Sequence, residues 1–238
     1  MLTTRIQRMV ILAGIFSLFA AYVGLWLRFI NIPVERTGSD FMGFYSVGRI
    51  AQEQGPAYVY DPSLQQKFQQ EVVGFELAPG QVLINQHLPF LIPVLQAVVS
   101  QDYVASFHRW NTLMLLLYSI GIVLLSSLLK TRGLDRGMIL QASLGGLLFY
   151  PLFFSFLNGQ DTAVAFLGLS IWVFGLMTGR DMLAGLGLSL VTARPHIAIV
   201  MAIPMFFRRR KVFWRLDGVS KRLFHASEIE KARDEDQD

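Results

Sequence analysis

Residues 110–129 read WNTLMLLLYSIGIVLLSSLL, and this stretch identifies the class of protein to which the chain belongs. It contains no charged side chain. As a helix it is about 30 Å long, which matches the thickness of the hydrocarbon core of a bilayer. Three other blocks are also apolar and uncharged, namely residues 9–27, 137–158 and 162–178. We therefore predict four segments that cross a membrane.

The composition of the whole chain favours the same class. Of the 238 residues, 53% are hydrophobic and 16% are charged, and the mean hydropathy is +0.45. Soluble domains carry about 25% charged residues, so this much apolar surface excludes a soluble globular protein and a disordered chain. The absence of cysteine excludes a disulfide scaffold. The net charge is +4, but the basic residues lie between apolar blocks and at the C-terminus, so we expect no nucleic-acid partner.

The basic residues orient the segments, because Lys and Arg are enriched on the cytoplasmic side of a membrane. They form four clusters: Arg5 and Arg8, residues 130–136, Arg180, and residues 208–211. Residues 33–102 instead carry seven acidic and three basic side chains. We predict an integral, multi-pass protein of the plasma (inner) membrane, with a cytoplasmic N-terminus and residues 33–103 as a large outer loop.

Two further apolar blocks do not fit a single crossing. Residues 88–100 are too short, so we expect them to lie at the outer interface or to enter it partway. Residues 182–207 are interrupted by Arg194-Pro195, and the topology favours two half-spans that meet there, because proline breaks a helix. The expected fold is an all-α polytopic module over residues 1–211, with about six membrane segments, two of them short or broken. The outer loop carries interfacial helices, and residues 212–238 form a polar cytoplasmic tail.

Gly38-Ser39-Asp40-Phe41 follow the first apolar block at the start of the outer loop. One interpretation is a helix N-cap, in which Ser39 or Asp40 accepts backbone hydrogen bonds. The other makes Asp40 a carboxylate at the membrane surface that takes a proton from a bound hydroxyl. Tyr45 and Arg49 follow in the same stretch as candidates for substrate contact.

Two more polar candidates are expected on the outer side. His87 precedes Pro89 and is placed to hold a polar substrate, although a proline at a helix entrance also explains this stretch. Gln160 lies in the turn over residues 158–161, where the alternative is a plain polar turn with Asp161 capping the next helix.

Arg194-Pro195-His196 interrupt an apolar block. A cation inside a membrane segment costs at least about 2.5 kcal/mol, so it usually has a partner. Arg194 either binds a lipid phosphate, with His196 beside it, or extends from a helix end to the interface. The chain has no phosphate-binding glycine loop, and its four histidines show no metal-ligand spacing, so we expect no metal and no cofactor.

Taken in order, these residues resemble the polytopic glycosyltransferases of family 87, which have the GT-C fold and include polyprenol-phosphate-mannose-dependent mannosyltransferases. The resemblance covers residues 38 to 211. It rests on Gly38-Ser39-Asp40-Phe41, Tyr45, Tyr60-Asp61-Pro62, Pro89, Trp110-Asn111, Gly159-Gln160, Arg194-Pro195 and the basic cluster that follows. Two positions depart from the family pattern, since a Pro-Pro pair is replaced by Leu88-Pro89 and a lysine by Arg194.

The resemblance implies a GT-C-like helical bundle that transfers a hexose, with mannose expected, from a polyprenyl-phosphate donor to a lipid or glycan acceptor on the outer face. The transfer inverts the anomeric configuration, and the donor and membrane lipids are the expected partners. Asp40 is then the catalytic base, and Arg194 stabilises the departing phosphate. The implied substrate-binding residues are Tyr45, Arg49, His87, Gln160, Arg194 and His196.

Family members usually continue through several more membrane helices. We therefore expect the chain to be a fragment, a truncated product or a divergent member without the second half. The alternative functions are a non-catalytic or a transport membrane protein, because broken helices and charges inside the membrane also mark transporter sites.

Overall fold

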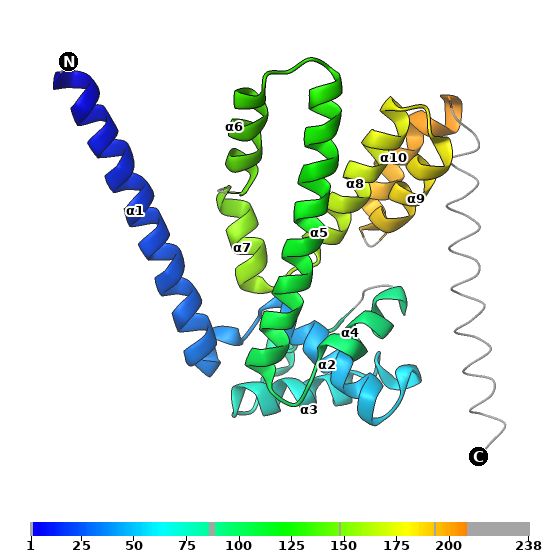
Figure 1. The fold of residues 1–238 in the computed structure, drawn as a ribbon. Helices are drawn as coiled ribbons and strands as arrows, with labels where there is room; N and C mark the ends of the chain where they lie inside the picture. Colours follow the sequence, from blue (N-terminus) through cyan, green and yellow to red (C-terminus); the bar gives the residue numbers. More distant parts are fainter. Residues whose placement is uncertain (1, 86–88, 148, 193, 209–238) are drawn as a thin grey trace.

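The computed structural model describes residues 2–85, 89–147, 149–192 and 194–208 (Figure 1), and the predicted tail and His87 lie outside them. Over these residues the chain is helical and contains no strand, which confirms the all-α class. The α-helices are α1 Leu2–Asn31, α2 Asp40–Glu53, α3 Pro62–Val73, α4 Ile92–Val98, α5 Tyr103–Thr131, α6 Arg136–Leu147, α7 Tyr150–Asn158, α8 Thr162–Met177, α9 Asp181–Val191 and α10 Pro195–Arg208. Short 3-10 turns lie at η1 Pro33–Arg36, η2 Pro56–Tyr58, η3 Pro79–Gln81 and η4 Pro89–Leu91.

Two helices of the described part, α1 over Arg5–Asn31 and all of α5, are long and apolar enough to cross a membrane. A third crossing is added if the bent pair α6 and α7 counts as one span. The chain is therefore a membrane protein with two or three helices that can cross the bilayer by length and composition. The fuller layout of six membrane segments stays a prediction.

The predicted crossing over residues 137–158 is not one straight helix. It is divided into α6 and α7, which meet at an angle of 41°. Phe149 has an extended backbone, and Pro151 occupies the first turn of α7. Proline lacks the amide hydrogen and clashes with the preceding turn, which explains why the helix ends and restarts here.

The later apolar blocks are short helices. α8 has 16 residues and is thus about 24 Å long, less than the roughly 30 Å that a full crossing needs. The prediction that residues 162–178 cross the membrane is therefore not confirmed by the length of α8 and stays a prediction. The predicted interruption at Arg194-Pro195 is confirmed, because α9 ends at Val191 and α10 begins at Pro195.

α8 and α9 form a close antiparallel pair, which α10 extends (Figure 1). Glycine makes the close approach possible. A Cβ atom on Gly187 would lie 2.4 Å from the backbone nitrogen of Trp172, and one on Gly175 would lie 2.4 Å from that of Ala184. These two glycines therefore allow the helix backbones to pack closely.

The predicted outer loop folds into a layer of short helices. α2, α3 and α4 lie together at the end of the molecule where α1 ends and α5 begins (Figure 1). α4 packs against α2, which confirms that this block does not cross the membrane by itself. Local signals set the helix limits: Asp61 and Asp102 accept amide hydrogen bonds at the starts of α3 and α5, and Gly74 ends α3 with a φ of 78°.

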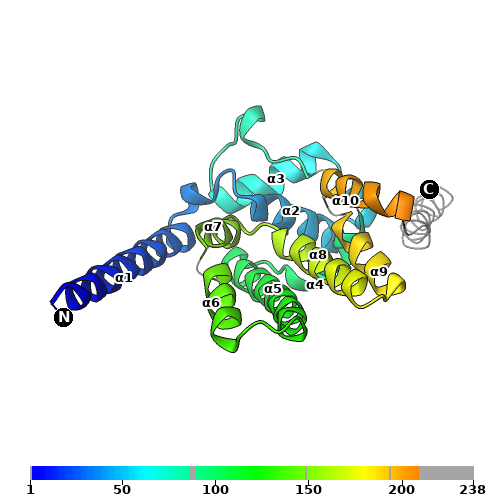
Figure 2. The same cartoon turned by 90° about the horizontal axis from the view of Figure 1, so that it is seen from above.

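α1 extends away from the other helices, as both views show (Figures 1 and 2). Its apolar side chains are exposed over most of its length, as expected for a helix that faces lipid. It contacts the other helices near its C-terminal end, where Tyr22 stacks on Phe153 with ring centroids 3.9 Å apart and Trp26 packs on Phe107.

Candidate functional site

Asp40 is the first residue of α2 and is partly buried. Ser39 occupies the N-cap position, but its side chain makes no capping bond; its hydroxyl oxygen lies 3.3 Å from that of Tyr103. Among the described residues, the Asp40 carboxylate has no hydrogen bond or ion pair. The helix start is confirmed, and the side-chain cap is not formed. The position of Asp40 in the first turn stabilises its negative charge.

The residue after Asp40 connects α2 to the turn between α7 and α8. Phe41 is fully buried and packs against Gly159 of that turn. A Cβ atom on Gly159 would lie 2.5 Å from the Cβ of Phe41, and its φ of 65° is also a glycine conformation. The indole Nε1 of Trp110 donates a 2.8 Å hydrogen bond to the Gly159 carbonyl. Three segments that are far apart in sequence therefore meet within direct contact.

Asp161 and Arg194 form an ion pair beside this junction. Nη2 of Arg194 lies 2.5 Å from Oδ1 of Asp161. The Asp161 side chain is fully buried, whereas 31% of the Arg194 side chain is exposed. Asp161 occupies the N-cap position of α8 but makes no side-chain cap bond, so the interpretation of its side chain as a cap is wrong. A buried carboxylate needs a counter-charge, which the arginine provides.

A partner was expected for Arg194, but Asp161 was not predicted to be that partner. The available signal was an acidic residue at the start of one apolar block and a basic residue within the next, on the same predicted side. Gln160 lies beside the pair and accepts a hydrogen bond from Thr162. His196 lies in the first turn of α10 and is exposed.

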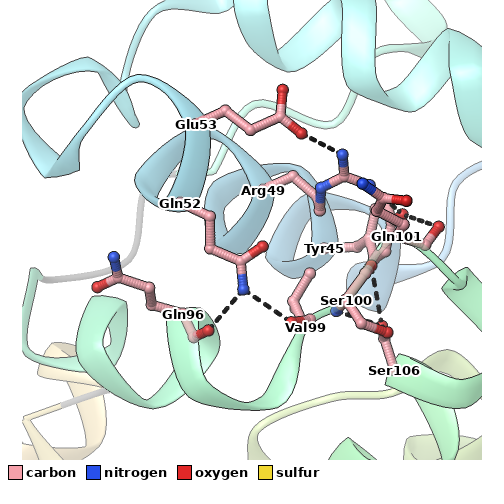
Figure 3. A network of polar contacts seen from close by, with 9 residues as sticks. All are labelled: Tyr45, Arg49, Gln52, Glu53, Gln96, Val99, Ser100, Gln101 and Ser106. Carbon is pink, nitrogen blue, oxygen red and sulfur yellow. Dashed lines mark hydrogen bonds and ion pairs between the residues drawn. The ribbon is translucent and has the colours of Figure 1, made fainter.

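Tyr45 and Arg49 form a second polar group on α2 (Figure 3). The Tyr45 hydroxyl donates to the Gln101 carbonyl at 2.9 Å and accepts from Nη1 of Arg49 at 3.1 Å. Arg49 also pairs with Glu53. Burial raises the pKa of the Tyr45 hydroxyl above its ordinary value. Both side chains are thus engaged within the layer formed by α2, α3 and α4, and their contact with a substrate stays a prediction.

The same face of α2 fixes α4 in place (Figure 3). The Gln52 side-chain amide donates to the carbonyls of Gln96 at 2.7 Å and Val99 at 2.8 Å. The Gln96 amide donates back to the Ala51 carbonyl at 3.2 Å. The two Gln52 bonds satisfy carbonyl groups at the C-terminal end of α4, the last helix before α5.

Two buried glutamines of α3 were missed by sequence analysis. Gln69 accepts from the backbone amide of Leu83 at 2.9 Å and donates to its carbonyl at 2.7 Å. Gln65 accepts from the Asn85 amide at 2.8 Å and donates to the Val59 carbonyl. Both glutamines are fully buried. Their spacing of four residues places them on one helix face, which was the only signal.

The described residues contain no group of three or more His, Asp or Glu side chains arranged to hold a metal ion. The expectation of a metal-free site stays a prediction.

The fold and the hydropathy of its helices define an all-helical membrane protein with a layer of short helices at one end. In comparisons with known proteins, no family model, no curated protein and no solved structure matches the chain. Membership in glycosyltransferase family 87 and the GT-C fold therefore stay predictions from the residues quoted above.

Proposed function

We propose that this protein is a membrane hexosyltransferase of the GT-C type. It moves a hexose, with mannose as the expected sugar, from a polyprenyl-phosphate donor to a lipid or glycan acceptor on the outer face. The single observation that supports this function best is the meeting of α2, α5, the α7–α8 turn and the α9–α10 break. These four segments carry Asp40, Trp110, Gly159 and Arg194, which are all among the residues on which the resemblance rests.

The reaction assigned to this site is an inverting displacement. Asp40 takes the proton of the acceptor hydroxyl, whose oxygen forms a bond to the anomeric carbon on the face opposite the phosphate. The bond from that carbon to the phosphate oxygen breaks, and its electron pair leaves with the phosphate. Arg194 donates hydrogen bonds to the phosphate as its charge increases, which lowers the energy of the transition state.

The test is sugar transfer from a radiolabelled polyprenyl-phosphate mannose in membranes that contain the full chain. Asp40→Asn removes the proposed base without changing size, so we expect transfer to fall by about 10²-fold or more while the protein remains inserted. Asp61→Asn is the matched control, because Asp61 is an exposed cap of α3 and asparagine caps a helix equally well. Equal transfer by Asp40→Asn and wild type rejects Asp40 as the base, and an inserted wild type without transfer rejects the function.

A second candidate function is transport, which the broken α9–α10 segment and its charged pair favour. The chain has no cysteine, so His196→Cys provides a single label in an otherwise unreactive protein. If an impermeant thiol reagent labels His196→Cys only when it is added on the outer side of the membrane, the result supports the transferase. Labelling from either side of the membrane, depending on the solute present, favours a transporter.

A further inference from the structure

We propose that Asp161 is a positioning residue, which holds the guanidinium of Arg194 where it binds the phosphate of a prenyl-phosphate donor. This inference rests on the proposed function and adds a residue that the resemblance does not include.

The ion pair leaves part of the Arg194 side chain exposed. Asp161 is fully buried and contacts Nη2, whereas 31% of the Arg194 side chain remains exposed. A guanidinium has five N–H donors in one plane, so fixing one nitrogen orients the others. The pair therefore restricts the orientation of the remaining donors.

Asp161 itself has a fixed place relative to α2. It follows Gly159, which packs against Phe41 and is hydrogen-bonded through its carbonyl to Trp110. Backbone bonds continue on both sides, from the Gln160 amide to the Ser155 carbonyl and from the Val164 amide to the Asp161 carbonyl. The same turn thus connects the helix that begins with Asp40 to Arg194. Displacement at a sugar carbon needs the base and the phosphate-binding group at a set separation.

Coulomb attraction and positioning predict opposite effects of removing the Asp161 charge. Asp161→Asn leaves Arg194 as an uncompensated cation, so attraction alone makes an anion bind more tightly. If Asp161 positions the guanidinium, binding weakens although the site has become more positive. A loss of phosphate affinity in this variant is therefore not an effect of charge.

The experiment measures binding of farnesyl phosphate to the purified full chain in lipid nanodiscs, with farnesol as the uncharged comparison. We expect wild type to prefer farnesyl phosphate, and Arg194→Gln and Asp161→Asn each to lower its affinity about tenfold or more. The double variant binds no more weakly than either single one, because the two side chains act as a unit. Asp161→Glu keeps the charge but shifts the guanidinium, so we expect affinity to fall severalfold in a variant that still folds, although the extra methylene at a buried position lowers its stability. It provides the readout if Asp161→Asn does not fold.

Three results overturn the inference. Unchanged or tighter binding by folded Asp161→Asn, or wild-type binding by Asp161→Glu, shows that Asp161 is only structural and leaves the proposed function intact. Wild type that does not prefer farnesyl phosphate, or Arg194→Gln that binds it normally, overturns the assigned phosphate site and the inference together. Equal competition by inorganic phosphate or phosphatidylglycerol overturns the assignment to a prenyl phosphate.

Discussion

Because Phe41 contacts Gly159, we predict that Gly159→Ala lowers the free energy of unfolding by more than the cost of the unfavourable backbone conformation. At a φ of 65° an alanine costs about 1–2 kcal/mol because its Cβ approaches the carbonyl. The added Cβ also lies 2.5 Å from the Cβ of Phe41, an atom attached directly to backbone that cannot turn aside. Overpacking of this kind costs about 1–3 kcal/mol, so we expect a total loss of roughly 2–5 kcal/mol in the free energy of unfolding.

The assay is unfolding in mixed micelles with increasing dodecyl sulfate, followed by the helical circular dichroism signal. Gly74→Ala is the matched control, because Gly74 has a φ of 78° but no atom within 4 Å of its Cβ position. We expect this control to lose only the stability that the backbone conformation costs, about 1–2 kcal/mol in the free energy of unfolding. Gly145→Ala lies in α6 with nothing nearby and is expected to gain up to about 1 kcal/mol. Equal losses for Gly159→Ala and Gly74→Ala refute the close contact between α2 and the α7–α8 turn.

Two other variants test the contact between α5 and the α7–α8 turn and the packing of α3. Trp110→Phe removes the indole hydrogen bond to the α7–α8 turn and is expected to cost about 1 kcal/mol more than Trp172→Phe. The buried indole nitrogen of Trp172 has no partner in the described part of the chain, so equal losses in the same unfolding assay contradict the assigned bond. Gln69→Leu leaves the backbone amide and carbonyl of Leu83 without partners and is expected to cost about 2–4 kcal/mol, with faster proteolysis after α3. Gln70→Leu, one position along α3, is the control, and equal proteolysis of the two variants argues against the buried amide contacts.

Residues close together in sequence carried much of the information about the helices. The apolar runs over residues 9–27 and 110–129 predicted the two longest helices, because hydropathy and length depend only on consecutive residues. The interruption at Arg194-Pro195 was also predicted, since proline acts on its own helix. The same rule applies to Pro151, but the bend between α6 and α7 was not predicted, because the residues around this proline form one continuous apolar run.

The candidate site residues were predicted one at a time from the sequence. Only some of them lie close together in the structure. Arg194 needed a counter-charge, and the general cost of a buried cation made that expectation sound. Choosing Asp161 as the partner required knowledge of how α8 and α9 pack, which depends on glycine contacts between helices. Tyr45 and Arg49 were expected at a substrate, and the structure shows the two side chains bonded to each other and to the residues before α5.

The class of protein, an all-helical membrane chain, follows from composition and hydropathy alone, because transfer into a bilayer is a sum over local stretches. The junction of Phe41, Trp110 and Gly159, the pairing of Asp161 with Arg194 and the buried glutamines of α3 arise only in the tertiary structure. Each of these depends on atoms within a few ångströms of one another but many residues apart. Such contacts form only after the helices have packed, when buried polar groups must find partners and close backbones exclude a side chain.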